Sequence, residues 1–132
     1  MFFRIIILLA LGAVSLLAAE NKLKWTALPD LPGGLGVAGP FAGVHNDALI
    51  VAGGANFPDG VPWRPTDDGA TPAKVYHDTI HVVTRDGDGY SIAEAKAKLP
   101  RALGYGVSIP TADGVLCIGG EWREGGETHR SA

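Results

Sequence analysis

The sequence predicts an all-β fold built from a repeated unit of short strands. Residues 48–54 form an apolar run that ends in Gly53-Gly54, and residues 114–120 repeat this pattern 66 positions later, ending in Gly119-Gly120. A Leu-Pro pair and a glycine-rich stretch precede both runs. Two copies of one pattern in the same surrounding frame indicate an internal repeat. The 19 glycines and 9 prolines suit strands and turns and argue against helices.

Each strand is expected where a short, β-branched-rich stretch is bounded by turn residues. Asn46-Asp47 and residues 86–89 are predicted to be turns, the second of them a hairpin turn. Residues 95–99 stay open between strand and loop, and the polar tail after Arg123 is expected to contain no strand. In chain order, strands are predicted at residues 25–28 (the outer strand of a preceding unit), 33–44, 48–54, 75–84, 90–93, 102–109 and 114–120.

The longest irregular segment is predicted at residues 55–74. Its four prolines prevent a regular ladder of backbone hydrogen bonds. An irregular segment of this length in a compact domain is usually functional or disordered. The strands around it make one four-stranded antiparallel unit, followed by half of another. A repeated four-stranded unit of about 50 residues is the sequence period of a β-propeller.

The first 19 residues have the pattern of a secretory signal peptide. Arg4 supplies the positive start, residues 5–17 are apolar, and Ala18-Ala19 precede the expected cleavage point. The apolar stretch is short for a membrane span, although an uncleaved anchor remains an alternative. The sequence thus predicts an exported protein, periplasmic or extracellular, without an integral membrane span after cleavage.

Charge and cysteine content restrict the classes of partner. The net charge is −3 at pH 7, and no cluster of Lys and Arg stands out, which argues against binding to nucleic acid or to anionic membranes. Cys117 is the only cysteine, so no disulfide can form within the chain. Because Cys117 lies in an apolar run, it is predicted to be a small buried hydrophobic residue.

The chain resembles kelch-repeat proteins in its Gly-Gly pairs, its Leu-Pro entries, and the placing of Trp25 and Tyr76 at outer positions. The segments GGANFP (residues 53–58) and LPRALGYG (residues 99–106) are similar to those of the kelch-type sialic acid mutarotases. These form the N-acetylneuraminate epimerase family, including its cyclically permuted branch. After the predicted signal peptide at residues 1–19, the resemblance implies a partial kelch β-propeller at 20–132, with repeats at about 33–98 and 99–122.

The number of repeats departs from this family. The resemblance implies about six blades in a closed propeller, and the sequence contains about one and a half. Blades bury their faces against their neighbours, so the sequence predicts a fragment or truncated product of doubtful independent stability. A third alternative is that such a truncated chain has no activity by itself.

The resemblance implies a sugar site on the face that surrounds the central channel. Asn56, Phe57 and Trp63 are expected near Arg101 and Tyr105, as the contacts of a sialic acid. Arg101 is the candidate for the sugar carboxylate because a guanidinium holds a carboxylate through two hydrogen bonds. Each of three residues has a structural alternative. Arg101 would hydrogen-bond loop carbonyls, Asn56 would form a turn, and Trp63 would pack the loop down onto the domain.

Mutarotation needs a general acid and a general base beside the anomeric carbon. Glu121, directly after the second Gly-Gly pair, is the catalytic candidate. The alternative is an exposed loop acid, with the catalytic pair in other blades. Tyr76 and Asp78 are assigned to packing and to turn formation.

Three further patterns are rejected, and neither a metal nor a cofactor is predicted. Residues 34–39 match G-x-G-x-x-G, but no strand precedes them and Pro40 follows. His77 and His81 would lie about 13 Å apart on one strand, at roughly 3.3 Å per residue. Residues 86–89 lack the downstream Glu of a calcium loop.

The sequence and the resemblance together predict cofactor-free interconversion of N-acetylneuraminate anomers. The alternative from another class is a non-enzymatic kelch module that binds a glycan or a protein. A homo-oligomer remains open.

Overall fold

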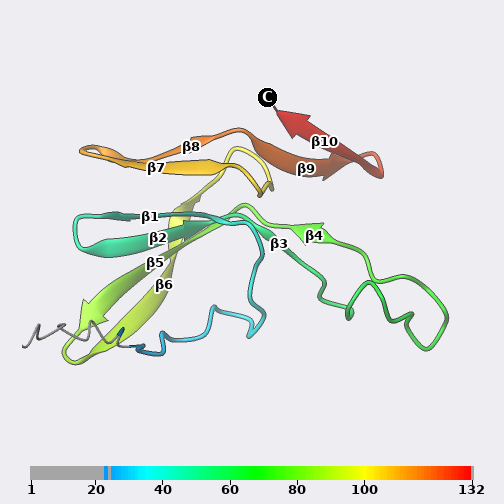
Figure 1. The fold of residues 1–132 in the computed structure, drawn as a ribbon, viewed down its shortest axis with the longest axis horizontal. Coiled ribbons are helices and arrows are strands. Elements are labelled where there is room, and N and C mark those ends of the chain that lie inside the picture. Colours follow the sequence, from blue (N-terminus) through cyan, green and yellow to red (C-terminus); the bar gives the residue numbers. More distant parts are fainter. Residues whose placement is uncertain (1–22, 24, 132) are drawn as a thin grey trace, which may run out of the picture.

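The computed structural model describes residues 23 and 25–131, and these contain strands and loops but no helix (Figure 1). The predicted signal peptide at residues 1–19 lies outside the described residues. The first unit is a four-stranded antiparallel sheet in the order β1-β2-β5-β6. Its strands are β1 (Phe41–His45), β2 (Ala48–Ala52), β5 (Thr79–Asp86) and β6 (Gly89–Lys98).

The second unit repeats the first two strands of this sheet. The hairpin β7-β8 lies beside β1-β2, and two further two-stranded sheets, β3-β4 and β9-β10, extend from the same end of the units (Figure 1). The bounds are β3 (Ala55–Asn56), β4 (Val75–Tyr76), β7 (Val107–Thr111), β8 (Gly114–Ile118), β9 (Gly120–Glu124) and β10 (Glu127–Ser131).

Isolated bridges show that the repeat is present in the structure as well as in the sequence. Ala38 bridges to Ala55 in the first unit, and Gly104 bridges to Glu121 in the second. Both members of the second bridge lie 66 positions after those of the first. The 66-residue offset inferred from the Gly-Gly pairs is therefore confirmed.

Turn chemistry explains the hairpins. Asn46 and Asp47 have φ values of 48° and 59°, the positive pair that a two-residue hairpin turn of type I′ requires. In the Gly-Gly pairs, Gly53 and Gly119 have nearly equal φ values of 66° and 68°, which glycine adopts without steric cost. The chain therefore leaves β2 and β8 in the same direction in both units.

The core lies between the two units and beneath the first sheet. Its buried apolar side chains are Phe41, Ala52, Ala55 and Val83. Glycines allow the close approach of the units: a Cβ on Gly43 would come within 2.7 Å of Val115, and a Cβ on Gly106 would overlap the ring of Phe41. Side chains of one unit, including the Phe41 ring, thus pack directly on the glycine backbone of the other.

Several strand predictions need correction. Residues 25–28 form no strand, and Trp25 is 88% exposed. Two strands begin later than predicted, at Phe41 and Val107, because the residues before them make only isolated bridges, Ala38 to Ala55 and Gly104 to Glu121, and no continuous ladder. Of the segment 95–99, which the sequence left open, residues 95–98 belong to β6 and Leu99 lies outside it.

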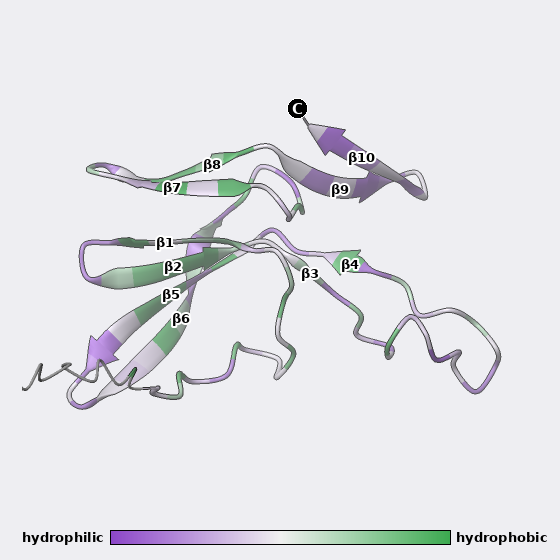
Figure 2. Ribbon diagram, in the orientation of Figure 1, coloured by the Kyte–Doolittle hydropathy of each residue, from purple (hydrophilic) through white to green (hydrophobic). Residues whose placement is uncertain are grey.

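Two further predictions are wrong. The tail was expected to contain no strand, yet β9 and β10 pair around Gly125-Gly126; both glycines have positive φ values of 60° and 85°, which permits a two-residue turn. Cys117 was expected to be buried, yet it is exposed, because no described strand pairs with the outer edge of β8. Figure 2 shows that the two hairpins of the second unit differ in hydropathy, with apolar residues along β7 and β8 and polar residues along β9 and β10.

Candidate functional site

The ends of β3 and β9 lie close together because the connector between the units bonds to both. Gly54 N–H donates to the carbonyl of Leu103 over 2.9 Å, and Gly104 exchanges backbone hydrogen bonds with Glu121. This brings the second Gly-Gly pair beside the first. Side chains from β4, the 57–74 loop and β10 therefore converge on Glu121.

Glu121 is a largely buried carboxylate with partners on both oxygens. Its side chain is 14% exposed. Oε1 accepts a hydrogen bond from the Tyr76 hydroxyl and lies 3.6 Å from Lys74 Nζ, and Oε2 lies 2.9 Å from Arg130 Nε. Tyr76 comes from β4 of the first unit and Arg130 from β10 of the second. We call Lys74, Tyr76, Tyr105, Glu121 and Arg130 the Glu121 cluster.

The partners of Glu121 favour its ionised form. The hydrogen bond from Tyr76 has the largest effect on the pKa of Glu121 and lowers it. Burial, the second-largest effect, raises that pKa, but the hydrogen bond and charge of Arg130 and the charge of Lys74 add to the effect of Tyr76, so the pKa lies below its ordinary 4.5. Burial, followed by the hydrogen bond to Glu121, raises the pKa of Tyr76, so its hydroxyl keeps its proton. At neutral pH the cluster therefore presents a carboxylate base beside a protonated phenol.

Lys74 holds a positive charge between aromatic rings and Glu121. Its Nζ lies 4.7 Å from the ring centroid of Tyr105 and 5.6 Å from that of Tyr76, within the range of cation–π attraction. Burial works against its charged form, but Tyr105, Tyr76 and Glu121 together outweigh burial, so the pKa of Lys74 lies above its ordinary value. With Lys74 and Arg130 positive and Glu121 negative, the cluster carries one net positive charge, which suits a monoanionic ligand.

The predicted site residues divide into two groups. Tyr105 and Glu121 lie in the same cluster, and Glu121 is not the exposed loop acid of the alternative interpretation. Arg101 instead lies over the ring of Trp122, 4.5 Å from its centroid, and Trp122 stacks on His129. No described contact joins Arg101 to Glu121.

The remaining predicted residues lie on or after β3. Asn56 lies in strand β3 and not in a turn; its amide nitrogen donates to the Gly36 carbonyl over 3.3 Å, and its Oδ1 lies 2.9 Å from His77 Nε2. Phe57 is half-buried, and Trp63 is 75% exposed on the 57–74 loop. Neither has a described contact with the Glu121 cluster.

Sequence reasoning missed Lys74 and Arg130 and assigned Tyr76 to packing alone. One signal for Arg130 was present, because Gly125-Gly126 is a two-residue hairpin signal. A hairpin centred there pairs Glu124 with Glu127 and therefore Glu121 with Arg130. Lys74 and Tyr76 carried no such signal, since their position depends on how the long loop returns to β3.

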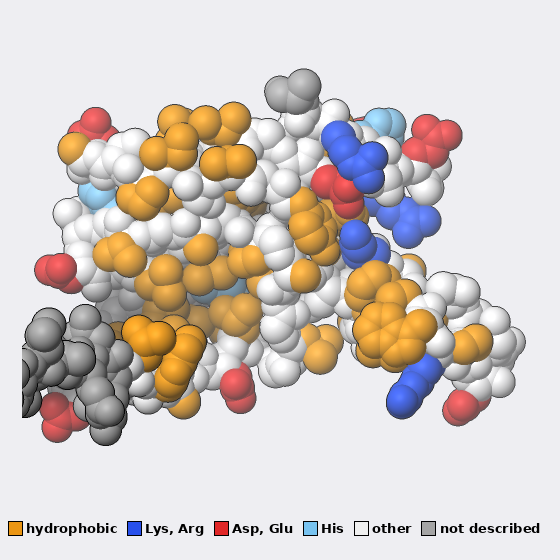
Figure 3. All heavy atoms as spheres, in the orientation of Figure 1, with side chains coloured by type: hydrophobic (Ala, Val, Ile, Leu, Met, Phe, Trp, Pro, Cys, Tyr) orange, Lys and Arg blue, Asp and Glu red, His pale blue; other side chains and the backbone are white. Residues whose placement is uncertain are grey.

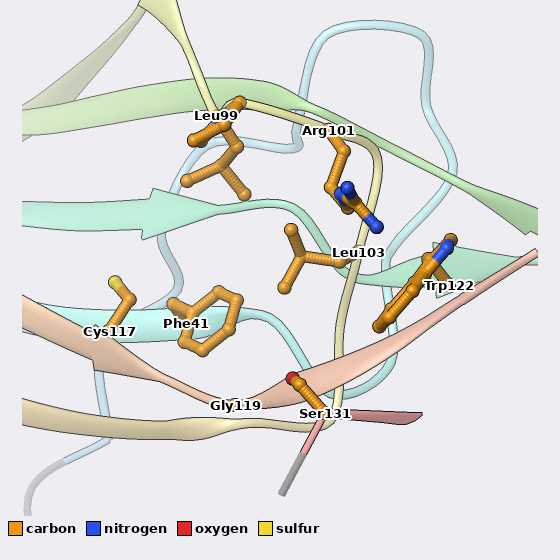
Figure 4. Close-up of a pocket in the computed structure, with 9 residues that line it drawn as sticks. Phe41, Leu99, Arg101, Leu103, Cys117, Gly119, Trp122 and Ser131 are labelled. Carbon is orange, nitrogen blue, oxygen red and sulfur yellow. The ribbon is translucent and has the colours of Figure 1, made fainter. Parts of the chain in front are cut away.

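A cavity of about 440 Å³ lies apart from this cluster. It is lined mainly by apolar side chains, with Arg101, Trp122 and Ser131 on one side (Figure 4). Its counterpart in the first unit, next to Gly53, measures only about 130 Å³, because Thr79, His81 and Glu94 of β5 and β6 occupy that space. The larger cavity thus marks where the second unit has no described counterparts of β5 and β6.

Charged and apolar side chains separate along the molecule. In Figure 3 acidic and basic side chains gather around β9 and β10, while apolar side chains gather over β7 and β8. Within residues 23 and 25–131, no three His, Cys, Asp or Glu side chains are grouped to hold a metal ion. No helix in that part of the chain is long and apolar enough to cross a membrane.

Comparisons with known proteins give the relationship of the chain. The profile of the family described as N-acetylneuraminate epimerase (NANM) matches residues 11–131. The N-acetylneuraminate epimerase of Yersinia pestis (strain Pestoides F) is 38% identical over 119 residues, which cover 82% of this chain and 29% of that protein. The enzyme of the same name from Brucella melitensis biotype 1 is 38% identical over 116 residues, covering 81% of this chain and 28% of that protein.

A solved structure, that of YjhT, superposes with a TM-score of 0.60 at 33% identity, covering 86% of this chain and 32% of that one. The predicted fold class is thereby confirmed: the described residues form about one and a half four-stranded blades of a kelch-type β-propeller. The chain spans less than a third of the length of these relatives. From its matching sequence profile, its relatives and its fold, this chain belongs to the N-acetylneuraminate epimerase family.

Proposed function

We propose that this chain contributes to a sialic acid mutarotase, which interconverts the anomers of N-acetylneuraminate without a cofactor. The observation that carries the proposal is the Glu121 carboxylate that accepts a hydrogen bond from the Tyr76 hydroxyl and lies between the Lys74 and Arg130 cations. The names of the family and of the curated relatives support the choice of substrate. The substrate is a monoanion, which matches the net charge of the Glu121 cluster.

The proposed reaction needs only proton transfers. Glu121 accepts the proton of the anomeric hydroxyl as the bond between C2 and the ring oxygen breaks, and Tyr76 donates its proton to that ring oxygen. The product is the open-chain ketone. Rotation about the C2–C3 bond presents the other face of the ketone, and reversal of both proton transfers closes the ring as the other anomer.

The charged partners have separate roles in this proposal. Lys74, close to both the Tyr76 ring and Glu121, stabilises the phenolate that forms transiently on Tyr76 and attracts the sugar carboxylate. Arg130, on Oε2 of Glu121, keeps the carboxylate ionised and aimed. The low pKa of Glu121 favours the base role over the acid role before reaction.

Exchange between sialic acid anomers, followed by NMR magnetisation transfer, tests the proposal on the full chain. We expect the chain to accelerate exchange and Glu121→Gln to lower the acceleration by about 100-fold or more, the usual contribution of a general base. Lys98→Ala, on the far edge of the first sheet, is the control and should exchange like the unchanged protein. Binding of the sugar without accelerated exchange would contradict the enzyme proposal and favour a glycan-binding module.

We also propose that residues 1–19 export the protein. The support is the sequence pattern of a positive start, an apolar stretch and small residues before the expected cleavage point. Fractionation of cells that produce the full chain or a form lacking residues 2–19 tests this. Equal amounts of both forms in the cytosol would contradict export.

A further inference from the structure

Tyr105 has a backbone conformation that its side chain does not favour. Its φ is 61°, and the other described non-glycine residues with positive φ, Asn46 and Asp47, belong to the β1-β2 hairpin turn. A left-handed conformation brings the Cβ of an L-residue close to its own carbonyl oxygen. For a bulky residue, this conformation persists only where the surroundings impose it.

The repeat shows which residue suits this position. Gly39 lies 66 residues earlier, at the equivalent place in the first unit, with a φ of 60°. The Tyr105 N–H donates to the Gly39 carbonyl over 2.7 Å, so the two equivalent residues are also joined. The fold therefore requires a left-handed residue at both places, and the second unit has tyrosine where glycine would be free of strain.

Burial of the ring does not explain why position 105 is a tyrosine, because the residue is 45% exposed. The ring lies against Gly39, where an added Cβ would overlap it. It meets Tyr76 edge-on, with centroids 6.4 Å apart and planes at 78°. The ring also faces Lys74, whose Nζ lies 4.7 Å from the ring centroid of Tyr105 and 3.6 Å from Glu121 Oε1.

We infer that Tyr105 is a positioning residue, whose ring holds the Lys74 ammonium beside Glu121. Lys74 ends the 57–74 loop, which leaves its long side chain with many conformations to lose. Cation–π attraction to Tyr105 and Tyr76 reduces that freedom and directs the charge toward the carboxylate. The placement of Lys74 stands on geometry alone, whereas its consequence for catalysis rests on the proposed function.

The placement can be measured without any assay of activity. Reductive methylation with ¹³C-formaldehyde gives each lysine of the full chain an NMR signal and keeps its positive charge, and Lys74→Arg identifies the Lys74 signal. A methylated amine near an aromatic centroid is shifted upfield by the ring current. Lys98, whose Nζ contacts Asp78 over 2.9 Å, is the internal reference.

We expect the Lys74 signal to lie upfield of that of Lys98 and to lose more than half of this difference in Tyr105→Gly. Tyr105→Asn, a second ringless variant that tolerates positive φ, should do the same, and Tyr105→Phe should keep the upfield position. An unmoved Lys74 signal in both ringless variants would overturn the inference.

Stability separates a positioning role from a packing role. Tyr105→Gly removes backbone strain, so its urea midpoint should equal or exceed that of the unchanged chain. A large fall in that midpoint, or failure of both ringless variants to fold, would make Tyr105 a packing residue and overturn the inference.

Kinetics connect the placement to the reaction. If the chain accelerates anomer exchange, Tyr105→Gly should raise KM for N-acetylneuraminate at least fivefold with a smaller change in kcat, and Tyr105→Phe should restore KM. An unchanged KM would contradict the functional role of the placement. If the unchanged chain shows no exchange, the proposed function fails, and the NMR shift still decides the position of Lys74.

Discussion

The two units share a sequence pattern but bury it to different extents. Phe41 at the start of β1 is 2% exposed, whereas its equivalent Val107 at the start of β7 is 59% exposed. Ala52 is 4% exposed and its equivalent Ile118 is 46% exposed. The first unit has β5 and β6 beside β2, and the described residues hold no such strands beside β8. Burial of a blade strand is thus decided by its neighbours rather than by its own pattern.

The links after the Gly-Gly pairs differ just as much. In the first unit residues 57–74 separate β3 from β4, whereas Gly125-Gly126 alone separate β9 from β10. The long link delivers Lys74, and the short link places Arg130 opposite Glu121. The Glu121 cluster therefore depends on the difference between the units, since two identical links would not supply both cations in this way.

Replacing the equivalent residues Phe41 and Val107 should give the largest contrast between the units. Phe41→Ala should lower the free energy of unfolding by about 3–5 kcal/mol, because it empties a buried site between the units. Val107→Ala, at an exposed position, should change it by about 0.5 kcal/mol or less. Urea unfolding followed by circular dichroism measures both. Equal losses would mean that the second unit is as well covered as the first.

Alanine substitution of the first glycine of each Gly-Gly pair should also destabilise the first unit more than the second. Both have positive φ, so alanine at either place costs about 1–2 kcal/mol in backbone strain. A Cβ on Gly53 would also overlap the carbonyl oxygen of Leu103, whereas a Cβ on Gly119 meets nothing nearer than 3.5 Å. Gly53→Ala should therefore be the more destabilising by about 1–3 kcal/mol in urea midpoints. The reverse order would contradict the packing of the connector on the first unit.

Tyr76→Phe should weaken the link between the units at Glu121. Loss of the hydroxyl should raise the pKa of Glu121 toward 4.5, as followed by ¹³C NMR of the carboxylate, and destabilise the chain by about 1–2 kcal/mol at neutral pH. Because the folded-state pKa of Glu121 is lowered, its stabilising effect is complete above the ordinary pKa and is lost as pH falls through the lowered value. The difference from the unchanged chain should therefore shrink below about pH 4.5, and a constant difference would exclude Glu121 as its source.

Lys98→Ala should have the smallest effect. Lys98 pairs with Asp78 inside the first unit, and both side chains are substantially exposed. The hydrogen bond from Lys98, followed by its charge, lowers the pKa of Asp78, so the variant should raise that pKa toward its ordinary value. The urea midpoint should fall slightly at low salt and match that of the unchanged chain at high salt. A loss that persists in high salt would show that Lys98 contributes by packing.

Local chemistry made much of the fold predictable. The hairpin over residues 41–52 follows from Asn46-Asp47 and the apolar run after it, and the 66-residue repeat follows from the Gly-Gly pairs. The prediction failed where a segment had little apolar pattern, as in β10, whose residues are polar and whose pairing depends on the Gly125-Gly126 turn. It also failed where exposure was inferred from hydropathy, as at Cys117.

The candidate site was less predictable than the fold. Glu121 and Tyr105 were selected from their place beside the Gly-Gly and Leu-Pro motifs, and the structure brings them into one cluster. Arg101 was selected by the same reasoning but lies over Trp122 instead, because its long, flexible side chain reaches that ring and forms a cation–π contact with it. Lys74 lies 47 positions from Glu121 in the sequence, and no local pattern predicts contacts over that separation.

By itself, the sequence determined the features that depend on neighbouring residues: strands, hairpin turns, the repeat, and through them the relationship to the epimerase family. The tertiary structure decided which copy of the repeat is buried, which cations reach Glu121, and why Tyr105 occupies a position suited to glycine. The physical reason is range. Backbone conformation responds to a few adjacent residues, whereas burial and charge pairing depend on which distant strands lie side by side.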